Sequence, residues 1–194
     1  MTAPLLLAMA EVELRAADRA RIDAFRAAHD PQHPLVPAHV TFVFPHLPID
    51  EAAECAHIAA IAGRTPPIDF VLRDAAAVPD PLHPGTTHLY LLPAEGEPAM
   101  RALHAALYGG PLAAALRRDL PFQPHLTIGA FSGIDAARQA AAGWNTDGLA
   151  IAGRIGALSV CRFDGKTLER LERRLPRKGC WHPGPIALCS FAQE

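Results

Sequence analysis

Two short stretches of this 194-residue chain carry the same pair of polar side chains at the same spacing. His39 is followed two residues later by Thr41, and His125 is followed two residues later by Thr127. An imidazole has a pKa near 6.5, so two of them together can supply a general base and a general acid. Threonine hydroxyls beside them are neutral donors suited to phosphate oxygens. The residue types therefore predict in-line cleavage of a phosphodiester, with no metal required.

Strands are the elements that must position these side chains. Residues 37–44 and 124–131 are rich in β-branched and aromatic residues, a composition typical of strands. Positions i and i+2 of a strand share one face, so each His points the same way as its Thr. Val40 and Phe42 then point into a core. A histidine hydrogen-bonded at a strand edge would explain either stretch alone, but both together predict that the two faces line one cleft.

The remaining pattern predicts an α+β protein in two comparable halves, each with one His-x-Thr strand. A stretch over 166–175 fits either a helix, by its leucine spacing, or a strand returning from the Asp164-Gly165 turn. The other expected elements are strands over 4–14, 68–78, 86–92 and 149–162, and helices over 18–28, 50–63, 98–118 (interrupted at 109–111) and 135–142.

Composition narrows the class of protein. The formal net charge of −2 argues against tight non-specific binding of long nucleic acid, although it permits a locally basic cleft. No run approaches the roughly 20 apolar residues of a membrane span. The four cysteines are dispersed and form no C-x-x-C pair, which predicts free thiols in the cytoplasm. The spacing of His33, His39 and His46 matches no zinc-ligand pattern. We expect a cytoplasmic monomer that binds no membrane, metal or cofactor.

The two motifs also resemble those of a known family. The second motif begins 86 residues after the first, at His125 against His39. The motifs read His39-Val40-Thr41-Phe42 and His125-Leu126-Thr127-Ile128. This pattern resembles the 2H phosphoesterase superfamily, and within it the bacterial proteins called 2′-5′ RNA ligase or RNA 2′,3′-cyclic phosphodiesterase. The resemblance implies a bilobal fold, with two antiparallel sheets related by pseudo-twofold symmetry, facing a central cleft, and helices outside. We assign that domain to residues 1–178 and a C-terminal tail to 179–194.

The resemblance also implies an activity and its residues. His39, Thr41, His125 and Thr127 would form the catalytic set, and relatives suggest His125 as base and His39 as acid. The substrate would be a cyclic phosphate on a nucleotide or a short RNA end, with 2′-5′ ligation as the reverse reaction. The alternative is a non-catalytic nucleotide- or RNA-binding module that uses the same cleft, although binding alone would not need two titratable imidazoles.

Phe131 and two departures from the family pattern bear on the substrate. Phe131 shares the parity of His125 and Thr127, so it either stacks a base or packs as an ordinary aromatic. RNA-processing members of the family that this pattern resembles have Leu-Gly where this chain has Pro45-His46, and often Ala-Arg where it has Gly129-Ala130. These departures leave the chemistry intact and the identity of the RNA end open.

Overall fold

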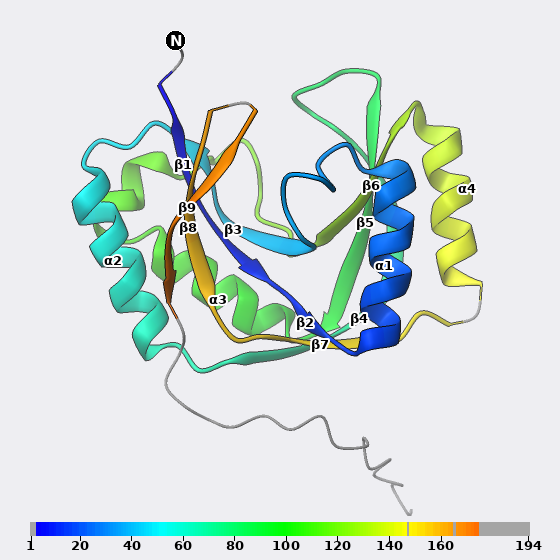
Figure 1. The fold of residues 1–194 in the computed structure, drawn as a ribbon, viewed down its shortest axis with the longest axis horizontal. Coiled ribbons are helices and arrows are strands. Elements are labelled where there is room, and N and C mark those ends of the chain that lie inside the picture. The colour runs from blue at the N-terminus through cyan, green and yellow to red at the C-terminus, as the bar shows by residue number, and fades with distance from the viewer. Residues whose placement is uncertain (1–2, 147, 165, 175–194) are drawn as a thin grey trace, which may run out of the picture.

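The chain folds into two antiparallel β-sheets flanked by helices (Figure 1). The computed structural model describes residues 3–146, 148–164 and 166–174. In chain order the elements are β1 (Leu5–Glu11), β2 (Glu13–Leu14), α1 (Ala16–His29), β3 (His39–His46), α2 (Glu51–Arg64), β4 (Ile68–Pro79), β5 (Thr86–Glu95), α3 (Glu97–Leu107), the 3₁₀ helix η1 (Gly110–Ala115), β6 (Leu126–Ser132), α4 (Ile134–Asn145), β7 (Ile151–Ile155), β8 (Leu158–Phe163) and β9 (Leu168–Arg174).

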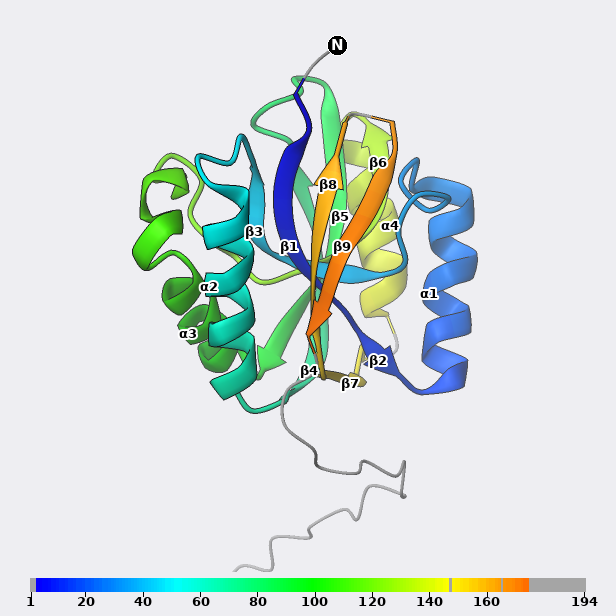
Figure 2. The ribbon, with the colours of Figure 1, turned by 60° about the vertical axis from the view of Figure 1, so that its left-hand side comes forward.

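Each sheet presents its His-x-Thr strand at an edge. The four-stranded sheet has the order β3-β1-β8-β9 and the five-stranded sheet the order β2-β7-β4-β5-β6, so β3 and β6 are both edge strands. Helices α2 and α3 lie on one flank of the strands and α1 and α4 on the other (Figure 2). The predicted α+β fold with two antiparallel sheets is confirmed.

The chain passes between the sheets at two points that the sequence pattern does not reveal. Between β1 and β2 it changes sheet at Val12, whose N–H donates to the carbonyl of Ala38 at 3.3 Å. It changes sheet again between β7 and β8, at Gly156 and Ala157. The predictions of one strand over 4–14 and of one strand over 149–162 were therefore wrong, because β1 and β2 belong to different sheets, as do β7 and β8. Apolar residues continue through β7 and β8, so composition alone does not show the change of partner. The buried positions do differ: Ile151 and Ile155 in β7, but Leu158 to Cys161 in succession in β8.

Strand β1 is apolar on both faces. Leu6, Ala8 and Ala10 are fully buried in the main core, which extends across both sheets. Leu7 and Met9 point to the opposite face, in a second apolar cluster. One face of β1 therefore stabilises the fold, while the other is available to line a site.

The alternative left open after the Asp164 turn is now decided in favour of a strand. Strand β9 pairs antiparallel with β8, with Cys161 opposite Arg170. The predicted helix over 98–118 ends at Leu107 and continues only as η1. The tail predicted over 179–194 lies outside the described residues. Within the part of the chain that is described, no helix is both long and apolar enough to span a membrane.

Helix α3 covers the free edge of β3. His104 Nδ1 lies 2.9 Å from the carbonyl oxygen of Phe42 and donates to it, since a carbonyl can only accept. The N–H of Phe44 donates to the hydroxyl of Tyr108, also at 2.9 Å. An edge strand otherwise leaves its backbone donors and acceptors unpaired. These two bonds therefore fix the strand that begins with His39.

Replacing Tyr108 with Phe removes the acceptor for the N–H of Phe44 and little else. We expect the free energy of unfolding to fall by roughly 1–2 kcal/mol, because a half-buried donor is left unsatisfied. Urea denaturation followed by circular dichroism measures this change. Thr146→Val is the control, since its hydroxyl bonds at an exposed helix end and its loss should cost less than about 0.5 kcal/mol. Equal losses in the two variants would contradict the role of the Tyr108 hydroxyl.

Candidate active site

His39 and His125 are held by the same backbone interaction. His39 Nδ1 lies 2.9 Å from the carbonyl oxygen of Pro37, and His125 Nδ1 lies 2.6 Å from that of Gln123. Because a carbonyl can only accept, Nδ1 carries the proton in both rings. The other nitrogen, Nε2, is left available to exchange a proton with a substrate.

The local structure agrees with the face pattern predicted for the two motifs. His39 is the first residue of β3 and pairs with Glu11 of β1, whereas His125 directly precedes β6. Thr41 and Thr127 are half-buried, as are the two histidines. The residues on the opposite faces of both motifs are fully buried: Val40, Phe42, Leu126 and Ile128.

The charge of His39 affects the pKa of His125. Strands β3 and β6 lie next to each other across the two sheets. Burial of the ring lowers the pKa of His125 to about 4; the bond to Gln123 opposes this, and the charges of His39 and His88 add to it. Burial likewise lowers the pKa of His39. Two neutral imidazoles that influence each other's protonation can divide the roles of base and acid between them.

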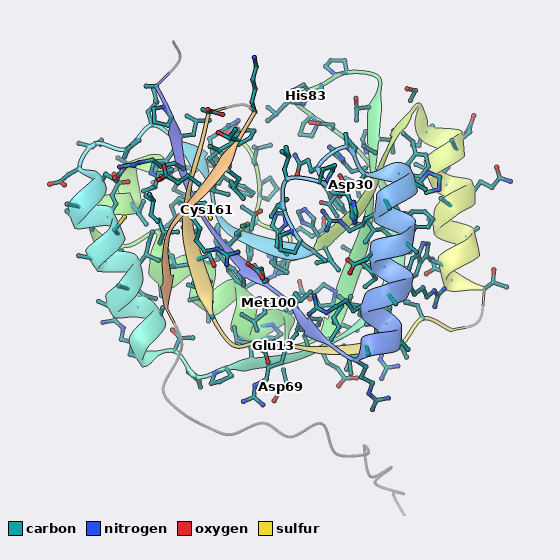
Figure 3. All side chains as sticks on the ribbon, in the orientation of Figure 1. Glu13, Asp30, Asp69, His83, Met100 and Cys161 are labelled. Carbon is teal, nitrogen blue, oxygen red and sulfur yellow. The ribbon has the colours of Figure 1, made fainter. Side chains whose placement is uncertain are left out.

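A buried ion pair holds the loop that leads to His39. Arg26 Nε donates to Asp30 Oδ2 at 2.9 Å, and its Nη2 donates to the carbonyl of Val36 at the same distance. Asp30 in turn accepts the N–H of Gln32 at 2.9 Å. Figure 3 labels Asp30 at the end of α1, where this loop begins. The only sign of the Arg26–Asp30 ion pair in the sequence is the i, i+4 spacing of the two charges. This ion pair was not predicted from the sequence.

An apolar cavity of about 160 Å³ adjoins the first motif. It lies on the face of β1 that carries Leu7 and Met9, and both His39 and Thr41 border it. Its other lining residues are Gln32, Leu35, Val36, Pro45, Phe163 and Leu168. Over the described residues, the lining contains no carboxylate, lysine or arginine. The cavity therefore suits an uncharged group attached to whatever the two histidines act upon.

Strand β5 contributes an aromatic neighbour to His125 that sequence reasoning missed. Tyr90 pairs with Thr127 in the sheet, and its ring stacks on the imidazole of His125 with centroids 3.7 Å apart. His88, two residues earlier, lies on the same half-buried face. The alternation of leucines with His88 and Tyr90 in β5 was visible in the sequence. Its pairing with β6 was not.

The structure does not place Phe131 on the face of His125 and Thr127. Opposite β5, Thr127 pairs with Tyr90 but Gly129 pairs with the adjacent Leu89, so Ile128 is an extra residue. Such a bulge reverses the alternation beyond it. The ring of Phe131 consequently stacks on His29 of α1, with centroids 5.3 Å apart.

His46, which departs from the family pattern, anchors the end of β3 to α2. Its Nε2 lies 3.0 Å from Oε2 of Glu54, which is fully buried. The other oxygen of Glu54 accepts the N–H of Ile49 at 3.0 Å. This histidine is therefore committed to a structural contact. Among the described residues, no group of three or more His, Cys, Asp or Glu side chains is arranged to hold a metal ion.

Comparisons with known proteins agree with this architecture. Among similar solved structures is Escherichia coli LigT in the apo form, with 18% identity and a TM-score of 0.54 over 91% of this chain and 100% of that chain. LigT complexed with 3′-AMP matches with 17% identity and a TM-score of 0.53, over 91% and 100%. Usb1 of Kluyveromyces marxianus matches with 10% identity and a TM-score of 0.52, over 86% and 97%.

These likenesses establish the fold, a LigT-like fold of the 2H phosphoesterases. The model of the 2′-5′ RNA ligase superfamily matches residues 13–167, and the chain belongs to this superfamily. A search of curated proteins found no match.

The lowered pKa of His125 makes stability depend on pH. The unfolded chain takes up a proton near pH 6.5, whereas the folded protein resists it until about pH 4. The contribution is therefore fully present above pH 6.5 and is lost as the pH falls toward 4. We expect the free energy of unfolding of His125→Asn, measured in urea at several pH values, to fall less steeply over this window than that of wild type. An unchanged slope would contradict the buried, neutral imidazole.

Proposed function

We propose that this protein is a metal-independent phosphodiesterase that hydrolyses the cyclic phosphate of a nucleotide or a short RNA end. The observation that carries the proposal is the matched pair of Nδ1–carbonyl bonds at His39 and His125. These bonds leave the Nε2 atom of each imidazole able to accept or donate a proton, and the effect of the charge of His39 on the pKa of His125 supports a shared site. Membership of the 2′-5′ RNA ligase superfamily supports the reaction class.

In this mechanism His125 acts as the base and His39 as the acid. A pKa of about 4 keeps His125 neutral, so its Nε2 can take a proton from water as the water oxygen bonds to phosphorus. The bond from phosphorus to one ribose oxygen breaks, and that oxygen receives the proton of His39. Bound phosphate favours the protonated form of His39, because an adjacent negative charge raises an imidazole pKa. The product is a phosphomonoester. If a 5′-hydroxyl takes the place of water, the same two proton transfers form a 2′-5′ linkage as the bond from phosphorus to the 3′-oxygen breaks.

Thr41 and Thr127 would hold the phosphate itself. Each lies on the same face as its histidine and is half-buried. A hydroxyl can donate to a non-bridging oxygen of the phosphate while the imidazoles act on the attacking and leaving oxygens. The threonines therefore bind the phosphate, while the proton transfers belong to the histidines.

The apolar cavity beside His39 and Thr41 supports a nucleoside as the group that carries the phosphate. With about 160 Å³ and no charged lining other than a titratable histidine, it suits a nucleobase better than a further phosphate. LigT, which shares the fold, has been crystallised with 3′-AMP. We assign the cavity to the base of the terminal nucleotide.

Turnover by matched variants tests the proposed reaction. Purified protein would be incubated with the four nucleoside 2′,3′-cyclic phosphates and with cyclic-phosphate RNA ends, in EDTA. We expect His39→Ala and His125→Ala to lower kcat by roughly 10²–10⁴, because one proton transfer is lost in each. Thr41→Ala and Thr127→Ala should cost less, since each removes one hydrogen bond. His57→Ala is the control, as its ring bonds the carbonyl of Leu107 between α2 and α3.

Three outcomes would count against this proposal. Wild-type activity in His39→Ala would refute the acid–base assignment. Tight binding of these ligands by wild type, with no turnover of any of them, would favour the non-catalytic binding module. Activity lost in EDTA and restored by zinc or manganese would indicate a metal-dependent reaction.

The cavity assignment predicts a selective loss of affinity when the cavity is filled. Leu35 is half-exposed in the loop that borders the cavity, so Leu35→Trp can enlarge the side chain without disturbing the core. We expect KM for nucleoside cyclic phosphates to rise by roughly tenfold or more, since the base loses its apolar contacts. KM for ribose 2′,3′-cyclic phosphate, which has no base, should change little. Ile49→Trp, at a residue 82% exposed, is the control; equal effects on both substrates would contradict the assignment.

A further inference from the structure

His125 is restrained on two sides, and only one restraint comes from the backbone. The bond from Nδ1 to the carbonyl of Gln123 fixes one nitrogen of the ring at 2.6 Å. It leaves the ring free to swing about that contact, and such a swing moves Nε2. The phenol ring of Tyr90 covers one face of the imidazole, with centroids 3.7 Å apart and planes inclined by 21°. An edge contact and a face contact together define the plane of the ring.

Tyr90 is in turn supported by a ring contact with His88, which is bonded to a carboxylate. Its ring is nearly parallel to that of His88, at 8° and 5.8 Å between centroids. His88 Nε2 lies 3.0 Å from Oδ2 of Asp80. Asp80 also accepts the N–H of Leu82 at 2.8 Å and contacts His83 Nδ1 at 2.8 Å. Figure 3 labels His83 in the loop between β4 and β5. The carboxylate of Asp80 therefore links this loop to the stacked rings of His88 and Tyr90.

We propose that Tyr90 is a positioning residue that fixes the imidazole of His125 for proton transfer, supported in turn by His88 and Asp80. This inference rests on the proposed function. Tyr90 acts through its ring face on His125 and need not touch the reacting atoms.

The geometry of β5 argues against a purely space-filling role for Tyr90. Its neighbours Leu89 and Leu91 face the other way and are fully buried in the core, whereas Tyr90 is half-buried on the face of the site. An aliphatic side chain could cover that surface equally well. Near-parallel stacking on an imidazole requires a flat ring, and a ring in this position blocks the swing that the Gln123 bond permits. Displacing a reacting nitrogen by about 1 Å can lower a rate 10²-fold.

Side-chain NMR and kinetics on matched variants test the inference. Long-range ¹H–¹⁵N spectra of the uniformly labelled protein report the tautomer of each histidine, and His125→Asn identifies the resonances of His125. In Tyr90→Leu we expect the ring protons of His125 to move downfield, as they lose the ring current of the phenol, and the second tautomer to become populated. Tyr90→Phe should retain the wild-type signals, because the flat ring remains. Phe25→Leu removes a ring from the same lobe, at Trp144 and His29, and should leave His125 unchanged.

Kinetics then connect the restraint to the reaction. On an accepted cyclic phosphate, Tyr90→Leu should lower kcat roughly 10- to 100-fold with little change in KM, while Tyr90→Phe should restore kcat. Tyr90→Met serves as a second non-aromatic variant if Tyr90→Leu does not fold. Wild-type His125 signals and wild-type kcat in a folded non-aromatic variant would overturn the inference.

The NMR readout separates this inference from the proposed reaction. If wild type turns over no cyclic phosphate but the His125 signals still depend on an aromatic ring at position 90, the positioning holds and the proposed function fails. If wild type is active and a folded Tyr90→Leu is equally active, the positioning fails and the proposed function stands.

Discussion

The hydrogen bond from each candidate imidazole to a backbone carbonyl two residues earlier is the contact on which the site depends. It assigns the proton to Nδ1 in both His39 and His125, and so determines which nitrogen can react. Because the acceptors belong to the backbone, the geometry of the site follows the conformation of the segments at Pro37 and Gln123. In the proposed reaction, whatever fixes those segments would therefore control the chemistry, even without contact with a substrate.

Different interactions stabilise the two segments, and α3 connects them. The loop before His39 is tied to α1 through the buried Arg26–Asp30 pair. On the other side, Arg101 of α3 donates to the carbonyl of Phe122, whose ring stacks on His104 with centroids 3.8 Å apart. His104 also bonds β3 at Phe42, so one helix touches both the strand of the first motif and the segment before the second. Two edge strands of different sheets thus acquire a common support.

The features that could be predicted from the sequence are those that depend on neighbouring residues in the chain. A period of two places His39 and Thr41 on one face whichever sheet the strand joins, so the motif faces were correct. Sheet membership depends on partners far along the chain, and apolar residues continue through the changes of sheet at Val12 and Gly156. Tyr90 was missed for the same reason, since its role arises only when β5 pairs with β6. The bulge at Ile128 reversed the parity on which the expectation for Phe131 rested.

His39 and His125 make the same bond to the backbone but have different neighbours. This difference suits the proposal that one acts as the acid and the other as the base. His125 is held by a hydrogen bond to the backbone and by stacking on the ring of Tyr90, and its pKa is lowered to about 4. A rigid, neutral imidazole is suited to accept a proton from a water that must attack along one line. His39 instead borders the apolar cavity, where a bound substrate would contribute its own charge and shape. In the proposed reaction, a bound phosphate would oppose the burial that lowers the pKa of His39, and so favour the protonated form that an acid needs.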